Sequence, residues 1–148
     1  MTRRNEGARL RHESVVEVHA PLGHVWRVLA DVRRWPEWTA SMRVVDPLRS
    51  GPLGVGSRVR VKQPRIPTAT WRITRYDPPV RFDWEARVIG VRLTATHSLT
   101  ETTNGHVLLA LSIELAGPLV RLLGRRIAVT ARRNLDLESA GLKTASKA

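Results

Sequence analysis

The chain has 148 residues, which is the length of one ordinary domain and excludes a two-domain enzyme. Its composition, 42% apolar and 26% charged, is that of a globular protein. Without cysteine there is no disulfide framework, no thiolate metal site and no cysteine nucleophile. Because the sequence also lacks a secretory signal and any apolar run long enough to span a membrane, it predicts a cytoplasmic protein.

The net charge of +12 is the one unusual feature of the composition, and it suggests a nucleic-acid partner as one hypothesis. The excess is spread along the chain: residues 1–74 carry 14 basic and 6 acidic groups, and residues 75–148 carry 11 and 7. No dense basic block and no zinc-finger, basic-zipper or RNA-recognition signature accompanies it. Binding to nucleic acid is therefore the weakest of the functional hypotheses.

The two ends of the chain lack periodicity. Residues 1–12 are polar and basic and are expected to form a disordered tail, and residues 144–148 are expected to form another. The expected domain therefore spans residues 13–143.

The first part of this domain predicts a strand, a helix and a turn. Ser14–Ala20 alternates apolar and polar residues with the period of a half-buried strand. Pro21–Val32 has a proline in its first turn and apolar residues at helical spacing, which predicts an amphipathic helix. Trp35–Trp38 predicts a short turn, or a single helical turn, that places two indoles beside each other.

The middle of the chain, from residue 42 to 116, predicts strands separated by turns. Arg81–Arg87 alternates apolar and charged side chains, so one face of the sheet is expected to be solvated. Asn104-Gly105 is a strong hairpin signal and is expected to join a strand at 92–102 to a strand at 106–116. The series predicts consecutive antiparallel hairpins.

After Pro118 the apolar period becomes helical, which predicts a long C-terminal helix. Its stripe comprises Leu119, Leu123, Ile127, Ala131, Leu135 and Leu142. The arginines of this segment lie mostly off the stripe and are expected to form a solvated face.

The order of these features resembles that of one superfamily. The stretches that carry the resemblance are Ala20–Asp31, Trp35–Trp38, Gly54–Ser57, Trp71–Thr74, Phe82–Trp84 and Gly117–Leu119. Together they are similar to the START-like (Bet v 1-like, SRPBCC) helix-grip fold, and within it to the polyketide cyclase/dehydrase and lipid-transport family. The resemblance covers residues 14 to 143.

The resemblance implies an α+β helix-grip fold. In this fold a curved antiparallel sheet of six or seven strands wraps around a long C-terminal helix, with one or two short helices after the first strand. It also implies an apolar cavity between the helix and the concave face, and members that bind lipids, sterols, quinones, hormones or polyketides. Carriers, receptors and cyclases share this fold, so the fold alone does not define an activity.

Twelve residues are expected to line such a cavity, most of them apolar. Trp84 shares a strand face with Phe82, and Trp71 shares one with Ile73. Trp38 is expected at the cavity mouth, with packing at the helix end as the alternative. The full set is Trp38, Val59, Val61, Trp71, Phe82, Trp84, Leu93, His97, Leu109, Leu111, Leu123 and Ile127.

His97 is the candidate for chemistry, because strand alternation places it on the same face as Leu93 and Leu99. An inward imidazole can hydrogen-bond a ligand or act as a general acid or base, and the alternative is a buried neutral histidine satisfied by the backbone. No second titratable group is apparent. Asp83 and Glu85 alternate with the aromatics and are expected to face water.

Several kinds of site have no candidate in the sequence. His12, His19, His24 and His106 show no metal-ligand spacing, so no metal and no cofactor is predicted. No serine lies in a nucleophile elbow. The Gly51–Gly56 loop precedes a strand, so it is not a phosphate loop and is expected to border the cavity entrance.

The first functional hypothesis is a protein that binds a hydrophobic small molecule (lipid, quinone or polyketide-like) between sheet and helix. The second is a cyclase or dehydratase that uses His97 as general acid/base, and the third is the nucleic-acid partner. The sequence leaves open both whether any reaction is catalysed and whether the protein is a homodimer.

Overall fold

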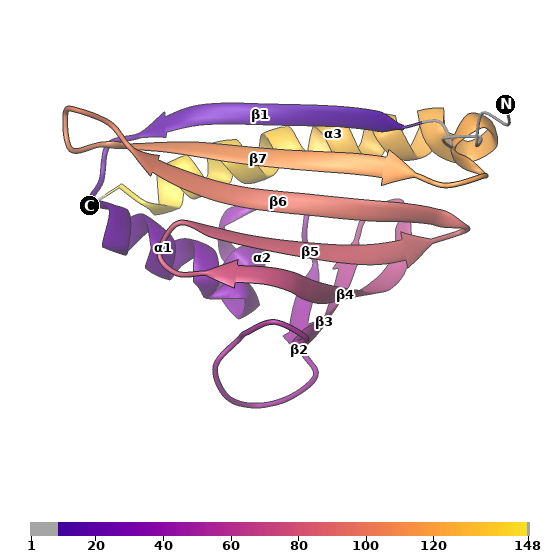
Figure 1. Cartoon of the computed structure of the whole chain (residues 1–148), viewed down its shortest axis with the longest axis horizontal. Helices are drawn as coiled ribbons and strands as arrows, with labels where there is room; N and C mark the ends of the chain where they lie inside the picture. The colour runs from indigo at the N-terminus through magenta and orange to yellow at the C-terminus, as the bar shows by residue number, and fades with distance from the viewer. Residues whose placement is uncertain (1–8, 148) are drawn as a thin grey trace, which may run out of the picture.

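Seven strands form one antiparallel sheet, and a long helix packs against its concave side (Figure 1). The computed structural model describes residues 9–147. The strands are β1 (Leu10–Val18), β2 (Val44–Pro47), β3 (Arg58–Gln63), β4 (Ile66–Asp77), β5 (Arg81–Val88), β6 (Val91–Glu101) and β7 (Val107–Ala116). The helices are α1 (Leu22–Ala30), a 3₁₀ turn at Val32–Arg34, α2 (Trp35–Trp38) and α3 (Val120–Ala145).

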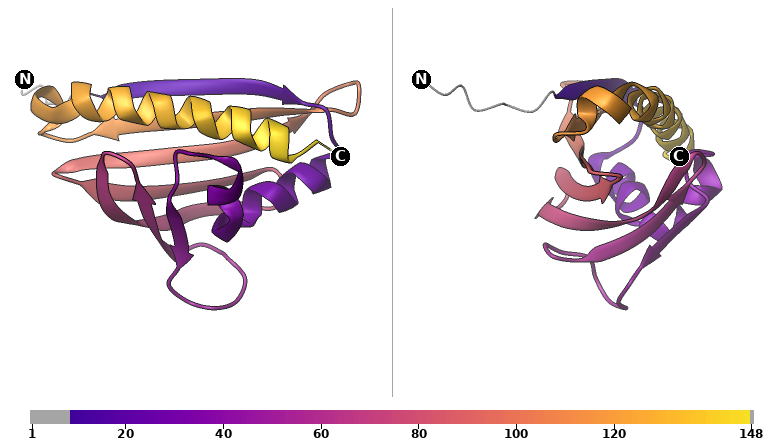
Figure 2. Two further views of the ribbon diagram at one scale, coloured as in Figure 1. Left: turned by 180° about the vertical axis from the view of Figure 1, so that it is seen from behind. Right: turned by 90° about the vertical axis from the view of Figure 1, so that its right-hand side faces the viewer.

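The strand order is β1-β7-β6-β5-β4-β3-β2, so the first strand joins the sheet beside the last. Between β2 and β7 every neighbouring pair is consecutive in the chain, as expected of a series of hairpins. The end-on view in Figure 2 shows the strands curving around an interior, with α3 along one side of it. This α+β helix-grip architecture confirms the predicted fold class.

The long helix α3 covers only part of the sheet. It packs on β1 and β7 and also meets α1 and α2. Where α3 meets α2, Gly141 lies against Trp38, and a Cβ atom at this position would overlap the Trp38 carbonyl oxygen. The close approach thus requires glycine, and α2 holds the C-terminal half of α3 in place.

The predicted elements are present, with shifted bounds. The first strand begins at Leu10, inside the segment expected to be a tail, and α3 continues to Ala145. Residues 1–8 and 148 of the two expected tails lie outside the described residues. The hairpin between β6 and β7 turns at Gly105, whose φ of 75° is the left-handed conformation expected of an Asn-Gly turn.

The core lies between the concave face of the sheet and the helices. Strand alternation buries Val59 and Val61 on β3, Trp71 and Ile73 on β4, and Phe82 and Trp84 on β5. A shift in the register between β4 and β5 at Ile73/Arg75 breaks this alternation. Arg75 is therefore exposed and pairs with Asp77, although it is an even number of residues from Trp71 and Ile73.

Candidate functional site

A small cavity lies between the sheet and α3, and it encloses about 40 Å³ of space open to water. The sheet contributes residues from β3 to β7, α3 contributes four residues, and Met42 lies before β2. The lining residues are Met42, Gln63, Ile66, Trp71, Trp84, Leu93, Ala95, His97, Ile113, Ala131, Asn134, Leu135 and Glu138. In this conformation the space suits a few water molecules, whereas pockets for drug-sized ligands measure roughly 300–1,000 Å³.

Four of the twelve predicted residues line the cavity: Trp71, Trp84, Leu93 and His97. Five others are buried in the surrounding core and do not line the cavity, namely Val59, Val61, Phe82, Leu109 and Leu111.

The remaining three predicted residues do not line the cavity either. Leu123 and Ile127 lie in the N-terminal half of α3, whereas the helix lines the cavity only from Ala131 onward. Trp38 packs against Trp35 at a ring-centroid distance of 5.6 Å and against Gly141. It therefore has the alternative role, packing at a helix end, because α3 needs a partner there.

The sheet side of the cavity is aromatic. His97 stacks on Phe82 with ring centroids 4.1 Å apart, and the edge of one ring faces the other where His97 meets Trp84. Trp35 of α2 contacts His97, Phe82 and Trp84, and its indole N–H donates to the Leu29 carbonyl over 2.9 Å. The ring of Trp71 lies next to that of Trp84, with centroids 5.6 Å apart. The cluster fixes the imidazole within a wall of large rings.

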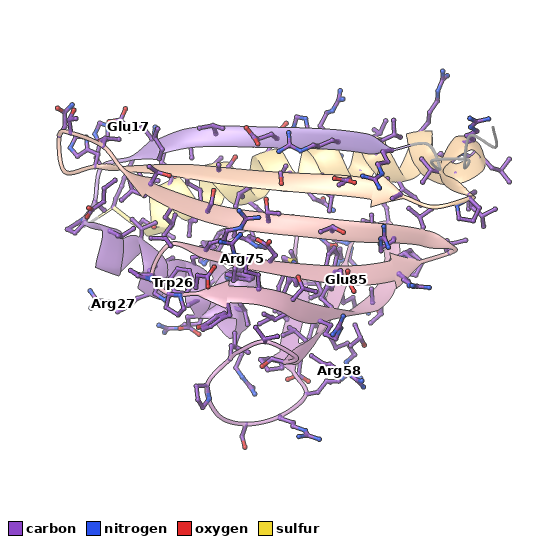
Figure 3. The ribbon with its side chains drawn as sticks, viewed as in Figure 1. Glu17, Trp26, Arg27, Arg58, Arg75 and Glu85 are labelled. Carbon is purple, nitrogen blue, oxygen red and sulfur yellow. The ribbon has the colours of Figure 1, made fainter. Side chains whose placement is uncertain are left out.

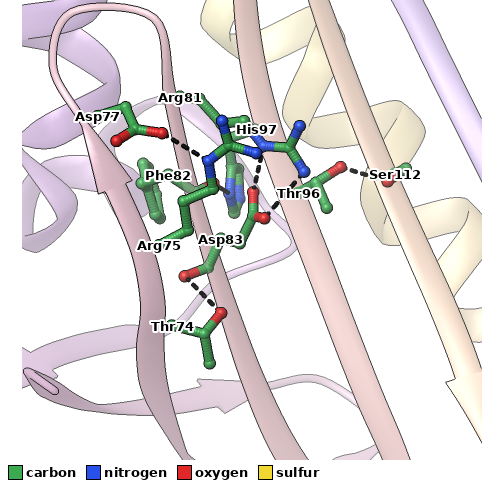
Figure 4. Close-up of polar contacts among 9 residues, drawn as sticks. All are labelled: Thr74, Arg75, Asp77, Arg81, Phe82, Asp83, Thr96, His97 and Ser112. Carbon is green, nitrogen blue, oxygen red and sulfur yellow. Dashed lines mark hydrogen bonds and ion pairs between the residues drawn. The ribbon is translucent and has the colours of Figure 1, made fainter. Parts of the chain in front are cut away.

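The protonation of His97 follows from its surroundings. Its Nδ1 lies 3.0 Å from the carbonyl oxygen of Phe82 (Figure 4), which can only accept, so Nδ1 carries the proton. Burial lowers the pKa of His97 to about 4, so the ring is neutral at pH 7. A neutral ring protonated at Nδ1 keeps a lone pair on Nε2, which can accept a hydrogen bond or a proton.

The helix side of the cavity is polar, and the sequence interpretation missed it. Glu138 is 6% exposed and accepts a hydrogen bond from the Ser41 hydroxyl over 3.3 Å, and Ser41 in turn lies 2.8 Å from the Thr39 hydroxyl. Burial raises the pKa of Glu138 to about 8, so this carboxyl is mostly protonated at pH 7. The cavity therefore contains a second titratable group beside His97.

A signal for Glu138 exists in the sequence. Ala131, Leu135 and Leu142 belong to the apolar stripe of α3, and Glu138 occupies the stripe position between the last two. A carboxyl on the buried face of a helix is a candidate functional group, because burying it costs stability.

Asn134 is the second polar residue of the helix wall. It lies one turn before Glu138, is 7% exposed, and lines the cavity. Its side-chain nitrogen Nδ2 is buried and has no hydrogen-bond partner within residues 9–147. An unpaired buried donor is costly, so a ligand or a water molecule that accepts from it would be stabilised in the cavity.

Asp83 differs from the sequence interpretation. It points away from the cavity, as predicted, but it is only 8% exposed instead of facing water. Arg81 covers it with two hydrogen bonds of 3.0 and 2.9 Å, and Thr74 and Thr96 lie nearby on the neighbouring strands (Figure 4). Glu85 is half-buried and pairs with Arg72. Both acids belong to ion pairs on the outer face of the sheet.

The Gly51–Gly56 loop does not contribute to the cavity lining. Residues 47–58 form a ring that projects from the sheet (Figure 1) and surrounds about 590 Å³ of largely open space. None of these residues is among those that line the cavity, whereas Gln63 and Ile66 of the β3–β4 hairpin are.

The helix-grip fold with a cavity beneath its C-terminal helix defines a START-like protein. The chain belongs to the family described as "Polyketide cyclase / dehydrase and lipid transport", whose profile matches residues 9–147. No curated protein matches the sequence. Within the described residues, no helix combines the length and hydropathy of a membrane span.

Solved structures with the same fold have diverse activities. The Zhui aromatase/cyclase from Streptomyces sp. R1128 is 19% identical, with a TM-score of 0.78 and 94% of each chain covered. Norcoclaurine synthase from Thalictrum flavum, solved with dopamine and hydroxybenzaldehyde, is 13% identical, with a TM-score of 0.72 and coverage of 95% and 87%. A hypothetical protein from Helicobacter pylori is 12% identical, with a TM-score of 0.78 and coverage of 95% and 89%. At these identities the likeness establishes the fold.

Proposed function

We propose that the protein binds an uncharged hydrophobic small molecule carrying a hydroxyl or carbonyl group, held between Trp84 and α3. The unpartnered Nδ2 of Asn134 is the observation that carries this proposal. A core filled only for stability would have an apolar residue at this place, since an unpaired buried amide reduces stability. A carbonyl or hydroxyl oxygen of a ligand would supply the missing acceptor.

The other polar groups of the cavity support a neutral ligand. Glu138 is mostly protonated at pH 7 and His97 is neutral, so the cavity offers one acid hydrogen and one imidazole lone pair. No lysine or arginine lines the cavity among the described residues. A carboxylate or phosphate ligand would have no countercharge there, and its desolvation would oppose binding.

Ligand entry requires the cavity to expand from its volume of about 40 Å³. The helix α3 packs on β1 and β7, and α2 holds its C-terminal half, so the helix side of the cavity is anchored. Gln63 and Ile66 of the β3–β4 hairpin line the cavity from the other side and are half-buried. We therefore expect the β3–β4 hairpin to shift away from α3 on binding.

The test uses native mass spectrometry of freshly purified protein, followed by titration with β-naphthol and naphthoate, monitored by tryptophan fluorescence. We expect a hydrophobic adduct or saturable binding of β-naphthol, with naphthoate binding at least tenfold more weakly. Replacing Asn134 by Leu should weaken β-naphthol binding, whereas L122A, at a site 79% exposed, should not. Absence of an adduct together with no binding of either probe would overturn the proposal.

A second candidate function is proton transfer, because one cavity holds both an imidazole lone pair and a protonated carboxyl. In such a step His97 Nε2 would take a proton from the carbon beside a ligand carbonyl while Glu138 gives its proton to the carbonyl oxygen, forming an enol. Deuterium exchange into β-tetralone, followed by NMR, tests this activity. It should occur with the native protein and be lost in both H97Q and E138Q, and exchange that survives in either variant rejects this mechanism.

A further inference from the structure

Three metal-ligating side chains converge on the outer face of the sheet, away from the cavity. The β1–β7 ladder ends at the pair Val18 and Val107, so the next residues, His19 and His106, lie opposite each other. Glu17 is two residues before His19 and shares its face because strand side chains alternate. Figure 3 shows Glu17 at this end of β1, beside the turn between β6 and β7. Sequence spacing did not predict the cluster, because His106 is distant in the chain.

The ligand atoms of the cluster lie near the distances of a coordination site. His106 Nδ1 and His19 Nε2 lie 3.0 Å and 3.6 Å from the same Glu17 oxygen. All three ligand atoms lie within 4.8 Å of one another, and ligands on one tetrahedral zinc ion are separated by about 3.3 Å. The two imidazoles stack with centroids 4.2 Å apart and planes 17° apart, so the rings must tilt out of this stack for the in-plane lone pairs of both to point at one ion. Both side chains are partly exposed, which leaves space for this rotation.

The chemistry of the cluster selects the kind of ion. Two imidazoles and one carboxylate suit a borderline transition metal, whereas Mg²⁺ and Ca²⁺ prefer sites made of oxygen. All three side chains retain exposed surface, which leaves room for a water molecule as a further ligand.

We propose that Glu17, His19 and His106 bind one divalent transition metal ion of the zinc type, which ties the edge strand β1 to the β6–β7 hairpin. This site is independent of the cavity and of the proposed function. Bound metal stabilises the folded chain by mass action, because Glu17 lies at the end of β1, His19 follows that strand and His106 precedes β7.

The test is calorimetric titration of tag-free protein with ZnCl₂, accompanied by thermal unfolding with and without the metal. We expect one equivalent of Zn²⁺ to bind, the unfolding temperature to rise, and MgCl₂ to do neither. H19N, H106N and E17Q should each weaken Zn²⁺ binding at least tenfold, and circular dichroism should show that they remain folded.

H12N is the matched control. His12 also lies on β1, and its Nε2 pairs with Oδ1 of Asp136 at 3.0 Å. It belongs to no three-ligand cluster in residues 9–147. It should bind Zn²⁺ like the native protein. Absence of Zn²⁺ binding in the native protein would overturn the proposal, as would binding that H19N and H106N both leave unchanged. Equal weakening in H12N would place the ion elsewhere and also overturn it.

Discussion

The two walls of the cavity are built on different physical principles. On the sheet side, Trp84, Trp71 and His97 are fixed by neighbouring rings and by the strand register. On the helix side, Asn134 and Glu138 are buried polar groups: Glu138 accepts a hydrogen bond from Ser41, and Asn134 Nδ2 has no partner within the described residues. Ser14 and Ser139 add a further polar contact between β1 and α3, 2.7 Å apart.

Because of this difference, we expect one wall to contribute mainly to stability and the other mainly to ligand specificity. Close-packed rings bury large apolar area and have one favoured arrangement, so the sheet wall supplies stability and a rigid surface. Buried polar groups that lack partners reduce stability, and they discriminate between ligands by the hydrogen bonds that each ligand offers. The helix wall is therefore where specificity is expected, and the variants below separate the two contributions.

The largest effect is expected on the sheet wall. Replacing Trp84 by Ala removes a side chain that is 2% exposed and contacts Trp35, Trp71, Phe82 and His97, so the free energy of unfolding should fall by about 3–5 kcal/mol. Urea denaturation measures this change. L122A, on the exposed face of α3, should change stability by less than about 0.5 kcal/mol. A comparably small loss in W84A would contradict the assignment of stability to the sheet wall.

His97 links the sheet wall to pH. Its pKa is about 4 in the folded chain against 6.5 in the unfolded chain, so between these values the unfolded state binds more protons. Stability conferred by the neutral ring is complete above pH 6.5 and is lost as pH falls toward 4, by about 3 kcal/mol in total. H97Q should lack this loss. The difference in unfolding free energy between H97Q and the native protein, measured across this range, should change accordingly, and a constant difference would refute the burial of a neutral ring.

The side chains of the sheet wall could be predicted from the sequence, whereas on the helix wall only Glu138 has a signal there, as a carboxyl within the apolar stripe. Strand alternation has a period of two, so the positions of Trp71, Trp84 and His97 on the inward face followed from the pattern alone. For α3 the apolar stripe gave the helix, but the end of the helix that meets the cavity depends on Gly141 docking against Trp38. That contact joins distant segments, so Leu123 and Ile127 were predicted as lining in place of Asn134 and Glu138.

The burial or exposure of single charged side chains also could not be predicted from the local sequence pattern. Asp83 lies on the polar face of β5 as predicted, yet Arg81 shields it, because a guanidinium two residues away reaches both carboxylate oxygens. Arg75 is exposed because of the irregularity between β4 and β5, which the sequence does not mark with a glycine. The positions of both side chains depend on a local contact or irregularity that no periodic pattern shows.

A smaller effect is expected from Glu138 on the helix wall. Its pKa is about 8 in the folded chain against 4.5 in the unfolded chain, so the folded state binds more protons in this interval. Its contribution is complete below pH 4.5 and is lost as pH rises through 8. Between pH 6.5 and 8, where His97 is neutral in the folded chain and contributes little further change, the loss from Glu138 should be about 2 kcal/mol.

The measurement is the free energy of unfolding at pH 6.5 and 8 for the native protein, E138Q and the exposed-site control E101Q. Glutamine cannot ionise, so the decline should disappear in E138Q and persist in E101Q. A decline of equal size in all three would mean that Glu138 ionises freely in the folded chain, and the helix wall would then be more solvated than its burial indicates.

The smallest change is expected at Asn134, where the sign of the effect is the informative part. Leucine has nearly the same shape and removes the unpaired Nδ2, so N134L should raise the free energy of unfolding by about 1 kcal/mol while weakening β-naphthol binding. N134A, which leaves a void, should lower stability and so shows that the gain in N134L comes from removing polarity. If N134L is instead less stable than the native protein, the amide is satisfied in the ligand-free state by water in the cavity. The helix wall would then be a hydrated structural surface, and specificity would have to come from Glu138 and His97 alone.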